Sequence, residues 1–290
     1  MITIIANEKA GSRAGMDALR RVTEWMQAEK IPFSMQITAG PGHATELADQ
    51  AIRQGANEIV CLGGDGTICE IVNGIAGRDA TLYFVPCGTG NDFAKMLHLP
   101  NDPVQALKAQ LEGIPLQADV GRLNRRYFMN VSGSGFDVEV LKQAARFKHL
   151  GRGKLPYLMG IFAALRHFRP LDVEITYEDG KTEKKAVTIF SVGNGSYIGG
   201  GMKAVPHAEI GDGLFDVVIA DGMSQKAILR LLSRFISGRH VEMPMVREFR
   251  CRELTIRCPG MTVDLDGELI PMDVARYAIL PGAVEVRMPR

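Results

Sequence analysis

A glycine-rich segment that follows a short apolar run is the part of this chain best suited to chemistry. Apolar residues 59–62 lead into Gly63-Gly64-Asp65-Gly66-Thr67, and apolar residues then recur at helical spacing from 68 to 75. Glycines let a backbone approach an anion closely, and free N–H groups at a helix start point toward it. Asp65 would repel phosphates unless a metal ion lay between them. The segment therefore predicts a nucleotide site that uses Mg²⁺, with a plain tight turn as the alternative.

Two further motifs place polar side chains directly after apolar runs. Gly88-Thr89-Gly90-Asn91-Asp92 follows residues 81–85, and Asp266-Gly267-Glu268 follows residues 261–265. If a phosphoryl group is transferred from the nucleotide to a hydroxyl, that hydroxyl is a poor nucleophile until a base takes its proton. Glu268 is the candidate for this base. Because Asp-Gly is also a common hairpin turn, an exposed turn glutamate is the alternative.

Three carboxylates, of Asp65, Asp92 and Asp119, stand at predicted strand or loop ends, and we expect them to converge on one edge. Oxygen ligands with intervening waters suit Mg²⁺. The alternative for Asp92 is an N-cap on the helix that starts at Phe93. For Asp119 it is a solvated position in an exposed strand.

The elements that must position these residues alternate in the first part of the chain. Strands are predicted at 2–6, 33–38, 59–62 and 81–85, and helices at 16–29, 44–54, 68–76, from 93, and at 103–112 with Asp102 as N-cap. This alternation predicts a mostly parallel, doubly wound α/β sheet with right-handed crossovers. Ligands of such sheets bind beyond the carboxyl ends of the strands, where both glycine loops and Thr38 would lie.

Strands predominate in the second part. They are predicted at 116–123, 126–131, 171–177, 185–192, 214–220, 248–257, 261–265 and 284–288, with helices at 137–150, 154–168 and 225–237. Short strands at close spacing predict an antiparallel β-sandwich. We therefore expect a nucleotide-binding α/β domain at 1–120 and a β-rich substrate domain at 121–290. The active site would lie in the cleft between them, and the C-terminal tail could pack back on the first domain.

Composition limits the function classes. The chain has 290 residues, 46% of them hydrophobic and 23% charged, and its net charge of +1 gives no case for nucleic-acid binding. Five cysteines without close pairs or zinc spacing fit a reducing cytosol. The N-terminus lacks the features of a signal peptide, and the longest apolar run is too short to span a bilayer. These features predict a cytoplasmic protein that is soluble or peripheral to a membrane.

The glycine motifs and the Asp266-Gly267-Glu268 turn together resemble the diacylglycerol kinase catalytic family, and its small bacterial soluble lipid kinases in particular. Gly193-Asn194-Gly195 and Gly199-Gly200-Gly201 also match in order, so the resemblance runs nearly end to end. Two positions depart from the family pattern. Glu8 follows Asn7 where proline is usual, and Cys69 stands where the family has asparagine.

The resemblance implies residue roles as well as a fold. It places ATP against Thr38, Gly63, Gly64, Asp65, Gly66, Thr67, Ile68, Cys69, Glu70, Gly88, Thr89 and Asn91. It makes Glu268 the proton acceptor, with Asp65 also catalytic, and lets Asp92 and Asp119 hold Mg²⁺ through water. A second, structural cation would lie at Glu209, Asp212 and Leu214, where a plain turn is the alternative. Cysteine cannot replace an asparagine amide, which both donates and accepts hydrogen bonds, so Cys69 is not expected to make the contacts that the family's asparagine makes in the nucleotide loop.

Residues 141–170 are basic and apolar. They include Lys142, Arg146, Lys148, Arg152, Lys154, Arg166 and Arg169 and no acidic residue. Such a segment suits contact with an anionic membrane surface, and a core-packed helix with a solvated basic face is the alternative. A lipid kinase needs that contact, because its substrate resides in the bilayer.

The sequence thus predicts an enzyme that transfers the γ-phosphoryl group of ATP to the hydroxyl of diacylglycerol or a related lipid, with ATP and Mg²⁺ as cofactors. A homodimer is possible, and a nucleic-acid partner is not expected. The alternatives are an NAD kinase-like small-molecule kinase and a non-catalytic nucleotide- or lipid-binding protein.

Overall fold

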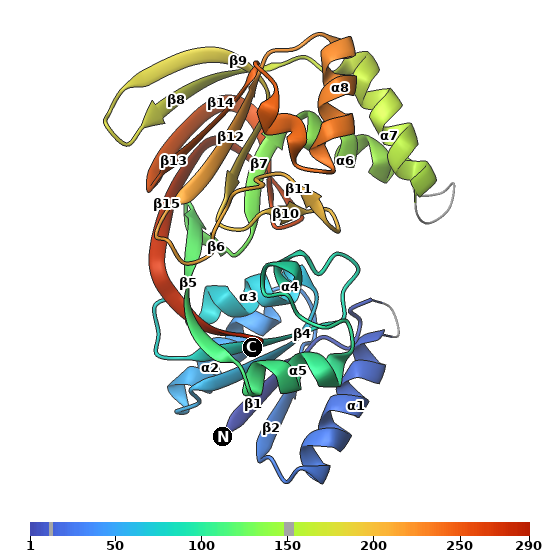
Figure 1. Ribbon diagram of the computed structural model, residues 1–290, viewed down its shortest axis with the longest axis vertical. Coiled ribbons are helices and arrows are strands. Elements are labelled where there is room, and N and C mark those ends of the chain that lie inside the picture. The colour runs from blue at the N-terminus through green and yellow to red at the C-terminus, as the bar shows by residue number, and fades with distance from the viewer. Residues whose placement is uncertain (12–13, 148–153) are drawn as a thin grey trace.

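Four parallel strands form the sheet of the N-terminal lobe, which is the lower part of the molecule in Figure 1. Their order is β4-β3-β1-β2, and each neighbouring pair runs parallel. The computed structural model describes residues 1–11, 14–147 and 154–290. The elements of this lobe are β1 (Ile2–Ala6), α1 (Ala14–Ala28), β2 (Phe33–Ile37), α2 (His43–Arg53), β3 (Glu58–Gly63), α3 (Asp65–Ile75), β4 (Thr81–Pro86), α4 (Asp92–Met96) and α5 (Pro103–Leu111). The predicted parallel α/β sheet is confirmed.

Helices cover both faces of this sheet because its strands are apolar on both sides. Ile4 packs in a core with Met26 of α1 and Leu107 of α5. Its neighbour Ile5 packs on the other face, in a core with residues of α2 and α3. Successive side chains of a strand point to opposite faces, so one short apolar strand supplies both cores. The sheet is therefore doubly wound, as predicted.

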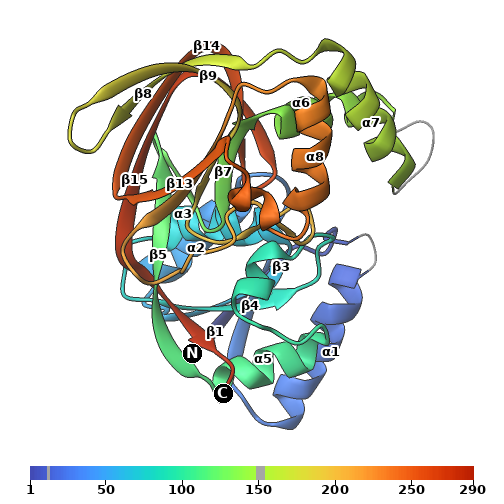
Figure 2. The same ribbon diagram turned by 45° about the horizontal axis from the view of Figure 1, so that its top comes forward.

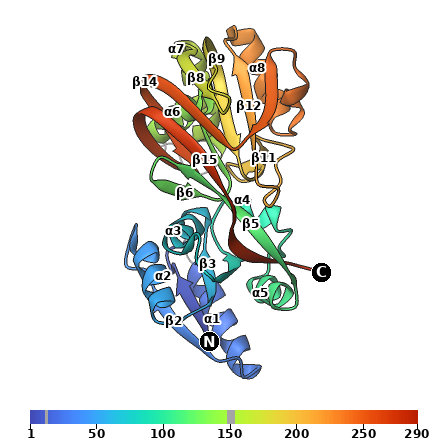
Figure 3. The same cartoon turned by 90° about the vertical axis from the view of Figure 1, so that its left-hand side faces the viewer.

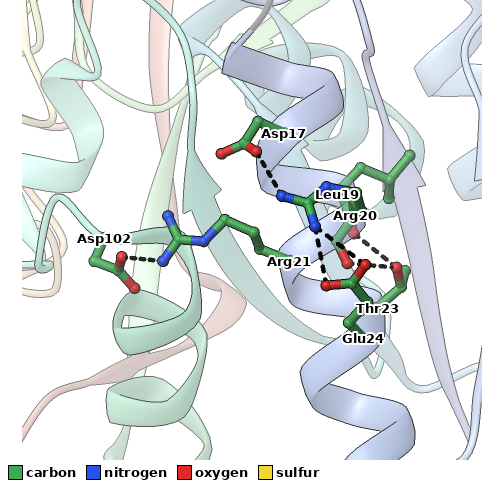
Figure 4. Close-up of polar contacts among 7 residues, drawn as sticks. All are labelled: Asp17, Leu19, Arg20, Arg21, Thr23, Glu24 and Asp102. Carbon is green, nitrogen blue, oxygen red and sulfur yellow. Dashed lines mark hydrogen bonds and ion pairs between the residues drawn. The ribbon is translucent and has the colours of Figure 1, made fainter.

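The layer of α1 and α5 is also joined by polar contacts, which Figure 4 shows. Asp102 is the N-cap of α5 and accepts hydrogen bonds from the N–H groups of Val104 and Gln105. Its other carboxylate oxygen pairs with Arg21 of α1. These N–H groups and the Arg21 guanidinium hold the pKa of the Asp102 carboxyl below its usual range.

Antiparallel strands form the C-terminal lobe, and their core lies between them. Phe128, Phe215 and Tyr277 meet there, with ring centroids 5.8–6.4 Å apart. Three helices cover the outer side of the strands (Figure 2). The elements are β6 (Arg126–Phe128), β7 (Val131–Gly135), α6 (Phe136–Arg146), α7 (Lys154–His167), β8 (Leu171–Tyr177), β9 (Thr182–Gly193), β10 (Tyr197–Ile198), β11 (Met202–Lys203), β12 (Phe215–Asp221), α8 (Gln225–Phe235), the 3₁₀ helix η2 (Arg239–Glu242), β13 (Val246–Cys251) and β14 (Glu253–Leu265).

Two long strands, β5 (Ile114–Leu123) and β15 (Glu268–Met288), connect the lobes (Figure 3). β5 pairs along its length with the second part of β15, from Tyr277 to Met288, and Glu285 and Val286 of β15 also pair with β4 in parallel. Through β15 the parallel strands and the antiparallel strands belong to one hydrogen-bonded network. The two lobes thus share one continuous sheet.

Several predicted boundaries in the second part are wrong. The strand expected at 248–257 is two strands, β13 and β14, separated at Arg252. β14 then continues to Leu265 through a bulge between Arg257 and Met261. All of residues 268–288 form one strand, although only 284–288 was expected, because Pro271, Pro281 and Gly282 indicate strand breaks in the sequence.

Candidate active site

The two glycine loops meet at the carboxyl edge of the parallel sheet. β3 and β4 are in register at Gly63 and Pro86, so the segments that follow leave the sheet side by side. A Cβ atom on Gly88 would lie 2.6 Å from the Cα of Gly64. No side chain fits in that space, which explains why both positions are glycine. Gly64 is also the N-cap of α3, so the helix begins where the loops touch.

Asp65 and Asp92 lie together beside Gly90. A Cβ atom on Gly90 would lie 2.8 Å from Oδ2 of Asp65 and 3.3 Å from Oδ2 of Asp92. The other oxygen of Asp65 accepts a hydrogen bond from the N–H of Phe93, so Asp65 holds the start of α4. Burial raises the pKa of Asp65, and the charge of Asp92 adds to the effect. A cation between the two carboxylates would lower this cost.

Asp92 connects the lobes. Its Oδ1 pairs with Nζ of Lys95 at 2.8 Å, and its Oδ2 accepts the N–H of Gly200 at 2.8 Å. Gly200 belongs to the loop between β10 and β11 in the C-terminal lobe. Asp92 is the first residue of α4 rather than its N-cap, which is Asn91. The N-cap interpretation of Asp92 is therefore wrong.

The structure shows what the carboxylate of Asp119 contacts. Its buried carboxylate accepts the N–H groups of Gly213 at 2.6 Å and Gly282 at 2.7 Å, so it holds two loops in place. Within residues 1–11, 14–147 and 154–290, no three His, Cys, Asp or Glu side chains are grouped as a metal site. Two carboxylates with waters and substrate phosphates suffice for Mg²⁺, so Asp65 and Asp92 would hold this ion once Lys95 leaves Oδ1 of Asp92.

In the loop that was predicted to hold a structural cation, the carboxylate oxygens of Asp212 already have protein partners. Oδ1 of Asp212 accepts the N–H of Leu214 at 3.0 Å, and Oδ2 pairs with Arg250 at 3.3 Å. The hydrogen bond with Asp216 is the main cause that raises the pKa of Arg250, and the charges of Asp212 and Glu209 in this loop add to it. The arginine therefore supplies the positive charge that a cation would have brought.

A cavity of about 430 Å³ lies over the two glycine loops. Of the residues predicted to contact ATP, those that line it are Thr38, Gly64, Gly66, Thr67, Glu70 and Gly88. Ile68 points into the core instead. Asn91 holds its own loop, because its amide bonds to both backbone groups of Gly88.

Sequence reasoning missed the contribution of the loop after β1. Asn7 and Lys9 line the same cavity, and Nδ2 of Asn7 donates a hydrogen bond to Oγ1 of Thr67 at 3.2 Å. Lys9 is the cationic side chain among these lining residues. Asn7 and Lys9 follow the predicted strand at 2–6, so they lie at the edge of the sheet where its ligands bind. That position in the sequence could have indicated their role.

Glu268 lies on the other side of the cleft from α3. The hairpin turn Asp266-Gly267 has positive φ at both residues, which is typical of a two-residue turn, and it joins Leu265 directly to Glu268. Glu268 lines a cavity of about 540 Å³ together with Gly66 and Glu70 of the opposite lobe. Its side chain is 62% exposed and pairs with Arg126 at 2.7 Å.

Asp266 anchors this hairpin. Its carboxylate accepts hydrogen bonds from three successive N–H groups, those of Met129, Asn130 and Val131. Burial nevertheless raises the pKa of Asp266 to about 7. The anchoring fixes where Glu268 emerges from the strand.

Cys69 and Asn73 face the C-terminal lobe from α3. Sγ of Cys69 lies 3.3 Å from the carbonyl oxygen of Tyr127, and burial keeps the pKa of the thiol well above its ordinary value. One turn later, the Asn73 amide bonds to both the N–H and the C=O of Tyr127, each at 2.9 Å. The amide contact between the lobes thus comes from Asn73, and Cys69 is a neutral side chain beside it.

Comparison with known proteins agrees with this architecture. Residues 1–123 match the family described as diacylglycerol kinase catalytic domain, and residues 130–288 match the YegS C-terminal NAD kinase beta sandwich-like domain. The chain belongs to the diacylglycerol kinase catalytic family, and it is an enzyme of the kinase class.

Relatives and solved structures agree along the whole chain. The sequence is 29% identical to a diacylglycerol kinase of Mycobacterium tuberculosis (100% of this chain, 95% of the relative) and 29% identical to one of Bacillus subtilis (99% and 96%). A crystal structure of a diacylglycerol kinase from Bacillus anthracis has a TM-score of 0.76 at 23% identity, covering 99% and 96% of the two chains. An NAD kinase from Archaeoglobus fulgidus in complex with ATP has a TM-score of 0.54 at 12% identity, covering 100% and 94%, so the fold is shared more widely.

Proposed function

We propose that this kinase transfers the γ-phosphoryl group of ATP to a hydroxyl group of diacylglycerol or a related lipid. The observation that supports the proposal most is the meeting of Gly64 and Gly88 beneath one cavity, which shares Gly66 and Glu70 with the cavity that the Asp266-Gly267-Glu268 turn lines. Phosphoryl transfer asks a protein mainly for positioning and charge stabilisation, and this edge offers both. The division near residue 120 would then separate nucleotide binding from lipid binding.

Each part of the site would have a distinct role. Backbone N–H groups at the start of α3 would bind phosphate oxygens, and Lys9 would offset their charge. Asp65 and Asp92 would hold Mg²⁺, which supplies further neutralisation of the phosphates when bound. Glu268 would accept the proton of the lipid hydroxyl as the new bond forms, after leaving its pair with Arg126.

The lipid requires access from a bilayer, and we propose that the helical side of the C-terminal lobe provides it. Leu158, Met159 and Phe162 of α7 are exposed, and Lys142 and Arg166 are exposed on α6 and α7. Apolar side chains beside cations suit the interface of an anionic membrane. Lys148 and Arg152 of the predicted basic segment, and the side chain of Lys154, lie outside the described part. Among the described residues, no helix is long and apolar enough to cross a bilayer.

Labelled ATP, Mg²⁺ and a mixed lipid extract test the proposed reaction directly. We expect label in the lipid fraction, and we expect Glu268→Gln to lower the rate by about 100-fold or more, the usual effect of losing an acid–base group. Asp65→Asn should also lower the rate, because it removes a charge that would hold Mg²⁺. Glu24→Gln makes the same chemical change on the exposed surface of α1 and is the matched control (Figure 4).

Three outcomes would contradict the proposal. If NAD is offered in the same assay and takes up label while the lipids do not, the protein is a small-molecule kinase. If ATP binds but is not consumed, the protein is a non-catalytic sensor. An unchanged rate for Glu268→Gln would remove the assigned base.

A further inference from the structure

Arg126 and Glu268 form an ion pair in the cavity of about 540 Å³ that both side chains line. Nη1 of Arg126 lies 2.7 Å from Oε2 of Glu268, and the two side chains are 51% and 62% exposed. Ion pairs this exposed contribute little to stability, because water competes for both charges. The pair can therefore open when a ligand offers either group a better partner.

Arg126 is the one cation among the described residues that line this cavity. The other charged lining residues are the carboxylates of Glu70, Asp266 and Glu268. Two of these carboxylates are held by the backbone, since Glu70 accepts the N–H of Ala44 and Asp266 accepts three backbone N–H groups. A phosphoryl group that enters the cavity is repelled by the carboxylates, and the Arg126 guanidinium is the lining side chain that attracts it.

The backbone beside Arg126 is fixed to the helix that starts at the nucleotide loop. Asn73 of α3 bonds to both the N–H and the C=O of Tyr127, each at 2.9 Å. Gly66, in the first turn of α3, lines this cavity and also the cavity over the glycine loops. A phosphoryl group that moves from the glycine loops to a hydroxyl beside Glu268 therefore passes into the cavity that Arg126 lines.

A guanidinium group suits this position because of how phosphoryl transfer distributes charge. The charge is spread over the oxygens of the group in transfer, and stabilising it is a large part of catalysis. The N–H groups of arginine form a planar fork that can bind two such oxygens at once. A lysine ammonium supplies the same charge but not this fork.

We propose that Arg126 is a catalytic residue that binds the phosphoryl group during transfer, and that its pair with Glu268 is the resting arrangement of both side chains. This inference rests on the proposed function. The acceptor hydroxyl gives its proton to Glu268 while its oxygen bonds to the γ-phosphorus, and the bond from that phosphorus to the oxygen of ADP breaks. The guanidinium that Glu268 has released keeps its protons and donates hydrogen bonds to oxygens of the moving group.

Kinetics of Arg126 variants test this role, with the lipid that takes up label from ATP as the acceptor. We expect Arg126→Gln to lower kcat by about 100-fold or more, with smaller changes in KM, because the lost contact forms mainly in the transition state. Arg126→Lys should recover part of the rate. Arg125→Gln is the matched control and should keep kcat, because Arg125 is exposed in the same turn and is not among the described lining residues.

A binding measurement separates this role from a merely structural one. Aluminium fluoride with ADP and Mg²⁺ mimics the phosphoryl group in transfer, and calorimetric titration measures ADP affinity with and without the fluoride. Arg126→Gln should lose about tenfold or more of the affinity gained with fluoride, the effect of a lost charge-assisted hydrogen bond. Its affinity for ADP alone should stay unchanged, which also shows that the variant is folded.

Glu268→Gln gives the opposite expectation in the same titration. This variant should keep the gain from fluoride or increase it, because the guanidinium has lost the carboxylate that competes with the phosphoryl group. If Arg126 served only to hold Glu268 in place, the two variants would not differ in this way.

The outcomes distinguish this inference from the proposed function. If the wild type labels a lipid and Arg126→Gln keeps its kcat, the inference is overturned and the lipid kinase activity stands. The inference is also overturned if Arg126→Gln keeps the gain from fluoride, or if both variants lose it equally. If no lipid takes up label, the proposed function fails, and the fluoride titration decides whether Arg126 binds a phosphoryl group.

Discussion

Asp266 shows how one side chain can organise a site without taking part in its chemistry. It pairs with three consecutive N–H groups from the segment between β6 and β7 and so ties the hairpin that carries Glu268 to the body of the lobe. Its neighbour Asp264 is also buried, and burial together with the charges of Asp137 and Asp266 raises the pKa of Asp264 to about 7. Both carboxyls are kept in place because backbone donors offset part of the cost of burial.

Asp266→Asn should lower the free energy of unfolding by about 1–3 kcal/mol, because one oxygen becomes an NH₂ group that faces N–H donors. Urea denaturation measures the change. Asp179→Asn is the control, since Asp179 sits in another hairpin turn and is exposed. It should change stability by less than about 0.5 kcal/mol. Equal effects of the two variants would contradict an anchoring role for Asp266.

At the scale of elements, the site is built by strand register and by helix starts. The parallel pairing of β3 and β4 places Gly63 opposite Pro86, so the glycine loops that follow these two strands contact each other. α3 begins at that contact, and the amide of Asn73 joins the same helix to β6. The nucleotide loop and the C-terminal lobe are therefore held by one helix.

The α1–α5 layer below the site offers a test of helix capping. Asp102→Ala should lower the free energy of unfolding by about 1 kcal/mol, because the N–H groups of Val104 and Gln105 lose their acceptor and Arg21 loses its partner. Asp17→Ala removes only an exposed ion pair with Arg20 (Figure 4) and should change stability by less than about 0.5 kcal/mol. Thermal unfolding compares the two, and a larger loss for Asp17→Ala would reverse this ranking.

At the scale of the whole molecule, stability should depend on pH through a buried histidine of the C-terminal lobe. His240 is buried against Phe235, and Nε2 lies 3.1 Å from the carbonyl oxygen of Ala204. Burial lowers its pKa to about 4, although the contact with Ala204 acts in the opposite direction. The unfolded chain, with an ordinary pKa near 6.5, then binds the proton more readily. Stability from this group is therefore complete above pH of about 6.5 and is lost as pH falls toward 4.

His240→Asn removes this dependence. Between pH 7 and pH 5 the wild type should lose about 2 kcal/mol more of its free energy of unfolding than the variant does. Buried carboxyls with raised pKa values change stability in the opposite direction, but they are present in both proteins and cancel in the difference. Chemical denaturation of both proteins at several pH values measures this difference. If the free energy of unfolding changes with pH in the same way in both, His240 is not the group responsible.

The sequence by itself determined the alternation of strands and helices, both glycine loops, the Asp102 cap and the family. These features depend on residues that are close in the chain or on motifs with few alternatives. Only the tertiary structure decided which carboxylates meet, because convergence depends on strand register and on long-range hydrogen bonds. Asp65 and Asp92 come together across Gly90, whereas the carboxylate oxygens of Asp119 accept hydrogen bonds from the backbone of Gly213 and Gly282. The contributions of Asn7, Lys9 and Asn73 likewise depend on contacts between residues far apart in the sequence.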